Sequence, residues 1–137
     1  MNIVNFDDPN FIKTTTYKEF MNKNASYGYL NIRAYAASKA IPIKGLKVVV
    51  SKVLSNNKVV FYSGVTDESG AIESITLPTP VVSTDDEAVP SSQDYEIEAT
   101  YENQKLTYKV KMYSNISVNQ NINVVPSMRL DGSIYGS

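Results

Sequence analysis

The stretch Tyr29-Leu30-Asn31-Ile32-Arg33-Ala34-Tyr35-Ala36 decides the fold class. Its apolar and polar side chains alternate strictly, which is typical of a β-strand with one buried and one exposed face. The exposed set combines aromatic, amide and guanidinium groups and consists of Tyr29, Asn31, Arg33 and Tyr35. The pattern therefore predicts a half-buried strand whose outer face is polar and aromatic.

Six further segments are rich in β-branched residues or repeat the same two-residue period. They cover about residues 46–54, 58–65, 71–77, 95–101, 106–112 and 116–125. Polar turns separate them, and no helical pattern lies between them. In the last segment the outward positions carry a row of amides, Asn119, Asn121 and Asn123. The sequence predicts an all-β, seven-stranded antiparallel Greek-key sandwich, with a small closed barrel as the main alternative.

The two ends of the chain differ from this strand pattern. Thr16-Tyr17-Lys18-Glu19 matches a capping box, in which a hydroxyl and a carboxylate satisfy the first backbone amides of a helix. A short helix over about 17–24 is expected, and a partly ordered leader is the alternative. The domain prediction is a leader at 1–27, one sandwich domain at 28–126 and a flexible tail at 127–137.

The composition restricts the chemistry that the chain can perform. It contains neither cysteine nor histidine, which excludes disulfides and cysteine-ligated zinc and removes the commonest general base near neutral pH. Carboxylates, lysines and tyrosines remain available. A formal net charge of -1 gives no electrostatic reason to expect nucleic acid or an anionic membrane as partner. These absences favour a binding protein without a cofactor over an enzyme.

From Gly28 onward the sequence resembles the carboxypeptidase regulatory-like modules of bacteria, also called transthyretin-like or prealbumin-like. The resemblance covers about 28–126 and is carried by Gly28-Tyr29-Leu30-Asn31-Ile32, Ile41-Pro42-Ile43-Lys44-Gly45-Leu46-Lys47-Val48, Val65-Thr66-Asp67-Glu68-Ser69-Gly70 and the alternating Tyr95, Ile97 and Ala99. Leu77-Pro78-Thr79-Pro80 and Val124-Val125-Pro126 are similar to a subgroup from spore-forming Gram-positive bacteria. Leu46, where the family usually has alanine, and Tyr101-Glu102-Asn103 depart from the pattern.

This resemblance implies a function as well as a fold. It implies a transthyretin-like sandwich that serves as a non-catalytic module for protein or cell-envelope association, with a carbohydrate-binding module as the alternative. Association with the cell envelope or spore follows from the resemblance alone. The sequence itself shows neither a signal peptide nor a transmembrane segment.

Two further patterns are candidates for chemical sites, and each has a simpler interpretation. An intramolecular isopeptide bond needs a buried lysine on the first strand, but Arg33 or Ala34 stands there, and arginine stays protonated. Glu96 or Glu98 as the acid and Asn121 or Asn123 as the amide are then left without a nucleophile. The run Asp85-Asp86-Glu87 lacks the spacing of a calcium loop, so a solvated acidic loop without metal is expected.

The remaining candidate is a recognition surface. Its residues share the outward positions of the first and last strands: Tyr29, Asn31, Arg33, Tyr35, Asn119, Asn121 and Asn123. Tyrosines and amides can anchor a protein partner or a glycan. The structural alternative is that strands favour tyrosine in any case, and that the leader helix covers some of these rings. Exposed outer strands also favour a homo-oligomer through edge pairing.

Overall fold

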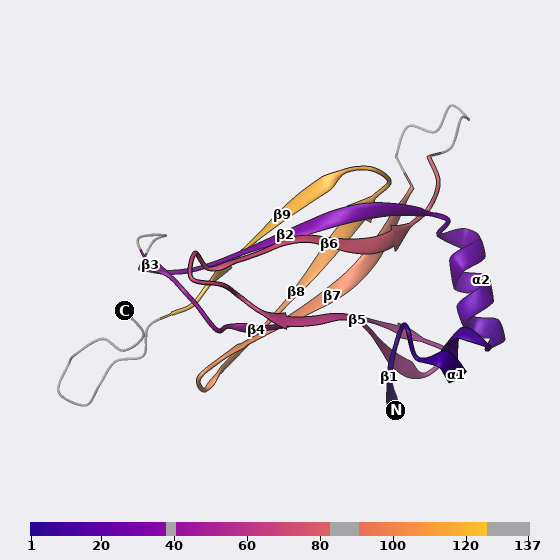
Figure 1. Ribbon diagram of the computed structural model, residues 1–137, viewed down its shortest axis with the longest axis horizontal. Coiled ribbons are helices and arrows are strands. Elements are labelled where there is room, and N and C mark those ends of the chain that lie inside the picture. Colours follow the sequence, from indigo (N-terminus) through magenta and orange to yellow (C-terminus); the bar gives the residue numbers. More distant parts are fainter. Residues whose placement is uncertain (38–40, 83–90, 126–137) are drawn as a thin grey trace.

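The computed structural model describes residues 1–37, 41–82 and 91–125. Within them the chain forms two layers of β-strands with two short helices at one end (Figure 1). The elements follow in the order β1 (Asn2–Asn5), α1 (Pro9–Ile12), α2 (Thr15–Lys23), β2 (Ser26–Ala36), β3 (Ile41–Pro42), β4 (Lys47–Leu54), β5 (Asn57–Val65), β6 (Ala71–Thr79), β7 (Ser92–Tyr101), β8 (Gln104–Tyr113) and β9 (Ser117–Asn123).

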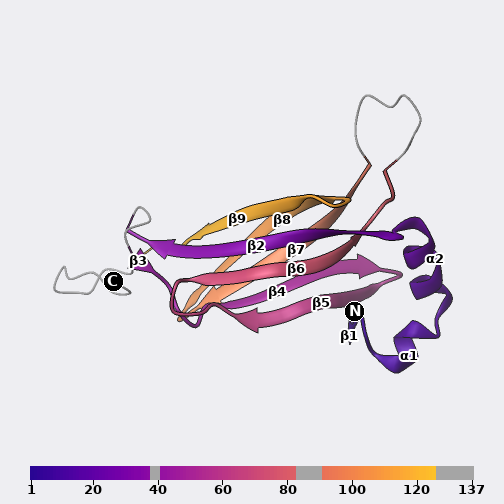
Figure 2. The same cartoon turned by 45° about the horizontal axis from the view of Figure 1, so that its top comes forward.

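The strands form two sheets that face each other (Figure 2). One sheet has the order β1-β5-β4-β7-β8, and the other has β3-β2-β6 with β9 along the opposite side of β2. The core lies between them and takes alternate side chains from each strand. Leu30 and Ile32 of β2 meet Val48 and Val50 of β4 and Ile97 of β7 there, and all five are fully buried.

The predicted all-β sandwich with a short N-terminal helix is confirmed, and each predicted segment corresponds to one of the strands β2 and β4 to β9. Two details differ. The short strands β1 and β3 are additional, and the pairs β1–β5 and β2–β9 are parallel rather than antiparallel. Side-chain alternation has the same period in parallel and antiparallel strands, so the sequence pattern could not show their direction. Ile116, the first residue of the predicted segment 116–125, precedes β9 and is exposed.

The N-terminal helix starts earlier than predicted. α2 begins at Thr15, and its N-cap is Thr14, whose hydroxyl accepts a hydrogen bond from the Tyr17 amide at 3.2 Å. The hydroxyl of Thr16 instead donates to the Ser55 hydroxyl at 2.9 Å. The predicted capping box is therefore wrong. Three consecutive threonines offer the same capping chemistry. In the observed helix the first of them is the N-cap, and Phe20 is buried.

An aromatic cluster attaches the N-terminal segment to the sandwich. Phe6 stacks on Phe61 of β5 with ring centres 4.4 Å apart, and Phe20 of α2 lies 5.6 Å from the same ring. Phe61 in turn meets the ring of Tyr95 edge-on at 5.0 Å. The segment thus packs against β5 and the end of the core. The domain division at 1–27, 28–126 and 127–137 stays a prediction.

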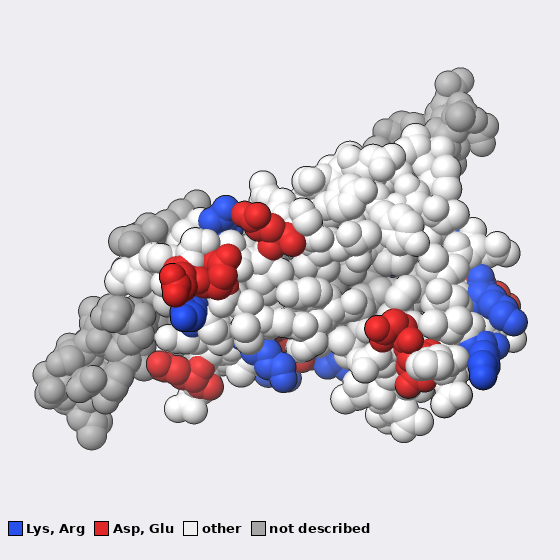
Figure 3. Space-filling view, in the orientation of Figure 1, with Lys and Arg blue, Asp and Glu red and all other residues white. Residues whose placement is uncertain are grey.

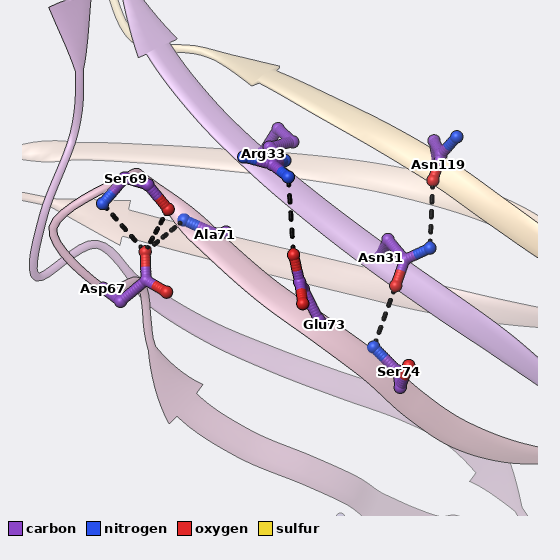
Figure 4. Close-up of polar contacts among 8 residues, drawn as sticks. All are labelled: Asn31, Arg33, Asp67, Ser69, Ala71, Glu73, Ser74 and Asn119. Atoms are coloured by element: carbon purple, nitrogen blue, oxygen red, sulfur yellow. Dashed lines mark hydrogen bonds and ion pairs between the residues drawn. The ribbon is translucent and has the colours of Figure 1, made fainter.

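The turn between β5 and β6 is organised by one carboxylate. Asp67 Oδ1 accepts hydrogen bonds from the Ser69 hydroxyl at 2.7 Å, the Ser69 amide at 2.9 Å and the Ala71 amide at 3.0 Å (Figure 4). These donors, the Ser69 hydroxyl first, hold the pKa of Asp67 below its usual value. The turn then closes through Gly70, whose φ is +77°.

We expect Asp67→Asn to lower the melting temperature at neutral pH, because the amide replaces an ionised acceptor of three hydrogen bonds. The folded-state pKa of Asp67 lies below its unfolded value. Its stabilisation is therefore present above the unfolded pKa and is lost as pH falls through the folded pKa. Thermal unfolding of both chains between neutral pH and pH of about 2 measures this. A melting difference that stays constant across that range would contradict the assignment.

Candidate functional site

The structure brings the predicted surface residues together. β9 runs parallel to β2, and its register sets Asn119 opposite Asn31, Asn121 opposite Arg33 and Asn123 opposite Tyr35. All seven residues of the predicted surface, namely Tyr29, Asn31, Arg33, Tyr35, Asn119, Asn121 and Asn123, lie on the outer face of this sheet and are half-buried or exposed. Whether this face binds a partner stays a prediction.

Three of these side chains have structural partners. Asn31 Oδ1 accepts the Ser74 amide at 2.8 Å, where β6 bulges opposite β2, and Asn31 Nδ2 donates to Asn119 Oδ1 at 3.1 Å (Figure 4). Arg33 Nη2 lies 3.4 Å from Glu73 Oε1, which offsets its charge. The face thus presents amides and tyrosines and a neutralised arginine. Such groups suit recognition rather than proton transfer.

Of the two chemical sites considered from the sequence, the described residues include one. Glu96 and Asn121 lie on the outer faces of opposite sheets, so the core would separate the acid from the amide of an isopeptide site. Asp85-Asp86-Glu87 falls outside the described residues. Among the described residues no group of three or more acidic side chains has the arrangement of a metal site.

The five-stranded sheet also contains a cavity of about 240 Å³, which was not predicted from the sequence. The pairing of β4 with β7 ends at Ser51 and Glu96, and the cavity opens beyond this pair. Its wall carries ammonium and carboxylate groups from four strands: Lys52, Lys58, Asp94, Glu96 and Lys109. Val53 and the Tyr95 ring supply apolar surface.

Lys52 crosses the gap between the two strands. Its Nζ donates to the Asp94 carbonyl oxygen at 2.7 Å and lies 5.7 Å from the centre of the Tyr95 ring. Burial of this amine lowers the pKa of Lys52, and the Asp94 charge opposes that shift more weakly. Tyr95 is buried, its hydroxyl donates to the Pro78 carbonyl at 2.6 Å, and burial raises its pKa. The Tyr95 ring therefore forms part of the cavity wall, and the Lys52 amine, whose pKa is lowered, lines the same cavity.

Several other charged side chains around the cavity form ion pairs. Lys58 Nζ contacts Glu98 Oε1 at 2.9 Å, and Lys105 approaches the second oxygen at 3.8 Å. The hydrogen bond from Lys58, with the charges of both lysines, lowers the pKa of Glu98. Lys111 likewise contacts Asp94 Oδ1 at 3.1 Å. Lys52, by contrast, is bonded to a backbone carbonyl.

One signal in the sequence could have revealed Lys52. It occupies an even position between Val50 and Leu54 in a strand whose even positions face inward. A lysine at such a position is unusual, because its ammonium must leave the core or lose hydration. Its partner could not have been inferred, since Asp94 lies 42 residues away in sequence.

The comparisons with known proteins address the fold. No protein-family model matches the sequence, and no curated protein matches it significantly. (S)-Allantoin synthase is 10% identical over 75% of this chain and 42% of its own, with a TM-score of 0.50. 5-Hydroxyisourate hydrolase from Klebsiella pneumoniae is 15% identical over 80% and 99%, at 0.49. Transthyretin from Sparus aurata is 14% identical over 70% and 89%, at 0.45.

The similarity to (S)-allantoin synthase supports the predicted β-sandwich, and at 10% identity it concerns the fold alone. It does not test the finer resemblance to carboxypeptidase regulatory-like modules or to proteins of spore-forming bacteria.

The functional prediction is corrected by the same finding. A non-catalytic module for protein or cell-envelope association, or a carbohydrate-binding module, was inferred from the resemblance and from the missing histidine. Chains of the same fold include enzymes, among them (S)-allantoin synthase. The fold therefore does not argue against catalysis, and function has to be argued from the site itself. No helix in the described part of the chain is long and apolar enough to cross a membrane.

Proposed function

We propose that this chain binds a small polar carbonyl compound in the cavity at the end of the β4–β7 pairing, and that the Lys52 amine reacts with it. The observation that carries the proposal is the position of Lys52. Its Nζ reaches a cavity of about 240 Å³ against the Tyr95 ring, and its partner there is a backbone carbonyl. A lysine whose ammonium form is disfavoured offers a neutral, nucleophilic amine closer to neutral pH.

The reaction follows from ordinary amine chemistry. Neutral Nζ attacks the carbonyl carbon, and one proton passes from nitrogen to oxygen to give a carbinolamine. A second proton, taken from solvent, lets the oxygen leave as water, which leaves a protonated imine. The carboxylates of Asp94 and Glu96 line the same cavity and suit the positive charge that the imine carries.

The size and lining of the cavity restrict the ligand. Its volume of about 240 Å³ lies below the range for pockets that bind drug-sized molecules, which runs from about 300 to 1,000 Å³. Charged groups outnumber apolar ones in its wall. A short, hydrophilic aldehyde or ketone fits these properties better than a large apolar one.

Reductive trapping tests the proposal. The full chain is incubated with glycolaldehyde and cyanoborohydride, and peptide mass spectrometry locates the alkylated lysines. Lys47 provides a matched comparison, because it lies exposed on the same strand, outside the cavity. We expect Lys52 to be modified severalfold faster than Lys47 at neutral pH. As pH rises, the modification rate of Lys52 should reach its plateau at a pH lower than about 10.4, the usual pKa of lysine.

Two variants separate reaction at the site from general lysine reactivity. Lys52→Arg keeps the positive charge and removes the nucleophile, so we expect it to abolish the fast phase. Lys47→Arg should leave that phase unchanged. Equal labelling of all lysines, or a fast phase that survives in Lys52→Arg, would refute the proposal.

The finer family resemblance is a separate proposal. We infer that the chain is related to the carboxypeptidase regulatory-like modules, and the turn motif supports this. Thr66 is buried and its hydroxyl donates to the Ile43 carbonyl at 2.6 Å while it accepts the Leu46 amide at 3.0 Å. The Thr-Asp-x-x-Gly pattern thus connects the two sheets through defined contacts.

A further inference from the structure

The cavity beside Lys52 carries more positive than negative charge. Its wall holds three ammonium groups, from Lys52, Lys58 and Lys109, and two carboxylates, from Asp94 and Glu96. The excess of one positive charge returns after Lys52 has reacted, because a protonated imine carries the same single charge as an ammonium group. A ligand with one negative charge would balance it.

The strand order places lysines on both sides of the gap at which the cavity opens. β5, β4, β7 and β8 are neighbours in that order, and the gap lies where β4 and β7 stop pairing. Lys58 comes from β5 and Lys109 comes from β8, so these two lysines flank the gap. An anion above the gap therefore lies between two ammonium groups, which lowers its electrostatic energy.

The two flanking lysines differ in their partners. Lys58 Nζ lies 2.9 Å from Glu98 Oε1, and both side chains are half-buried. Lys109 is exposed on β8 and stands opposite Glu96 in the β7–β8 pairing. No ion pair within the described part of the chain includes Lys109. Its ammonium group is thus available to an incoming anion.

This concentration of charge is a local feature of the surface. The face drawn in Figure 3 carries its charged side chains toward the ends of the molecule, with a wide region between them that has none. The whole chain has a formal net charge of -1. Local clusters of one sign attract ligands of the other sign, so the cavity can take an anion although the chain as a whole is slightly acidic.

We propose that the compound that reacts with Lys52 is a short α-oxo acid, whose carboxylate lies against Lys109 and Lys58. This inference rests on the proposed function and names its substrate class. An α-oxo acid carries its carboxylate on the carbon next to the carbonyl, which suits a cavity of about 240 Å³. The two ends of the ligand also meet opposite charges. Asp94 and Glu96 suit the positive imine nitrogen, and the lysines suit the carboxylate.

The carboxylate takes no part in the bonds that form and break. Lys52 Nζ bonds to the carbonyl carbon, and the carbonyl oxygen leaves as water after it has taken up one proton from the nitrogen and one from solvent. Cyanoborohydride then delivers hydride to the imine carbon and gives a secondary amine. Glyoxylate leaves a carboxymethyl group on the lysine, whereas glycolaldehyde leaves a hydroxyethyl group, so mass spectrometry distinguishes the two products.

Glyoxylate and glycolaldehyde form a matched pair for the test, because they differ only in a carboxylate against a hydroxymethyl group. In each reaction the rate at Lys52 is divided by the rate at Lys47, which lies outside the cavity. The different reactivities of the two aldehydes then cancel. We expect this ratio to be at least about threefold higher for glyoxylate, and the difference to shrink as salt is added.

Two variants locate the carboxylate. Lys109→Gln removes an ammonium group from the cavity wall, so we expect the ratio for glyoxylate to fall toward the ratio for glycolaldehyde. Lys105→Gln makes the same change of charge on the same exposed face of β8, outside the cavity, and should leave the preference for glyoxylate intact. Circular dichroism checks that both variants are folded. Glycolate, which has the carboxylate but no carbonyl, should slow the labelling of Lys52 in the native chain.

The outcomes separate this inference from the proposed function. Fast labelling of Lys52 with equal ratios for the two aldehydes would overturn the oxo-acid assignment and leave the reactive amine standing. Slow labelling of Lys52 by both aldehydes would refute the reactive amine, and the oxo acid with it. Equal losses in Lys109→Gln and Lys105→Gln would contradict binding of the carboxylate in the cavity.

Discussion

Gly70→Ala is expected to reduce the free energy of unfolding by about 2–5 kcal/mol, because strain and collision coincide at this position. The φ of Gly70 is +77°, a region that a Cβ disfavours by about 1–2 kcal/mol. An added Cβ would also meet the Ala34 carbonyl oxygen at 2.5 Å and the Ile43 amide nitrogen at 3.1 Å. Both are backbone atoms and cannot rotate away.

The same contact has a consequence for the sheets. The Gly70 carbonyl accepts the Ala34 amide at 2.8 Å, so a displaced turn also loses a bond between β6 and β2. Urea unfolding followed by circular dichroism measures the change in free energy.

Gly45 supplies the matched control. Its φ of +80° resembles that of Gly70, but nothing lies within 4 Å of the Cβ that alanine would add. Gly45→Ala should therefore show the conformational strain alone, about 1–2 kcal/mol. If both alanine variants lose the same free energy, the close approach of Gly70 to β2 is not what makes glycine necessary there.

Phe20→Ala should cost about 3–5 kcal/mol of stability. Its ring is 6% exposed and lies 5.9 Å from Phe6 and 5.6 Å from Phe61. Removing it leaves a void where α2 meets the core, and the neighbouring rings lose the contacts that attach the N-terminal segment. We expect one cooperative transition at a lower denaturant concentration, with tyrosine fluorescence and far-ultraviolet circular dichroism coinciding.

Ile3→Ala is the control for Phe20→Ala within the same segment. Ile3 is 69% exposed on β1, so its truncation should change the free energy of unfolding by less than about 0.5 kcal/mol. A Phe20→Ala chain in which the N-terminal segment detaches while the sandwich keeps its full stability would show that the segment does not fold together with the core.

Local pattern explains much of what could be predicted. Alternation placed Tyr29 and Asn31 on one face and Leu30 and Ile32 on the other, and the structure agrees. It could not place a helix start among the threonines at 14–16, because each can supply the same capping hydroxyl. The short strands β1 and β3 were missed since so few residues show no period.

Of the two candidate sites, one could be predicted from the sequence and the other could not. The outward row on β2 and the amides of β9 could be named from the sequence because each belongs to one strand. The cavity beside Lys52 could not, since it exists only where β4 and β7 stop pairing after Ser51 and Glu96. A lysine at an inward position indicates an unusual environment, but it does not identify the residues that surround it.

The sequence by itself determined the strands around Tyr29–Ala36 and which of their side chains face water, because burial of one face imposes a period of two on neighbouring residues. Only the tertiary structure decided that β9 lies parallel to β2, with Asn119 beside Asn31 at a separation of 88 residues. Strand direction and partner arise from contacts between distant segments as the two sheets close around a common core. A local period is identical for every such pairing and contains no information about it.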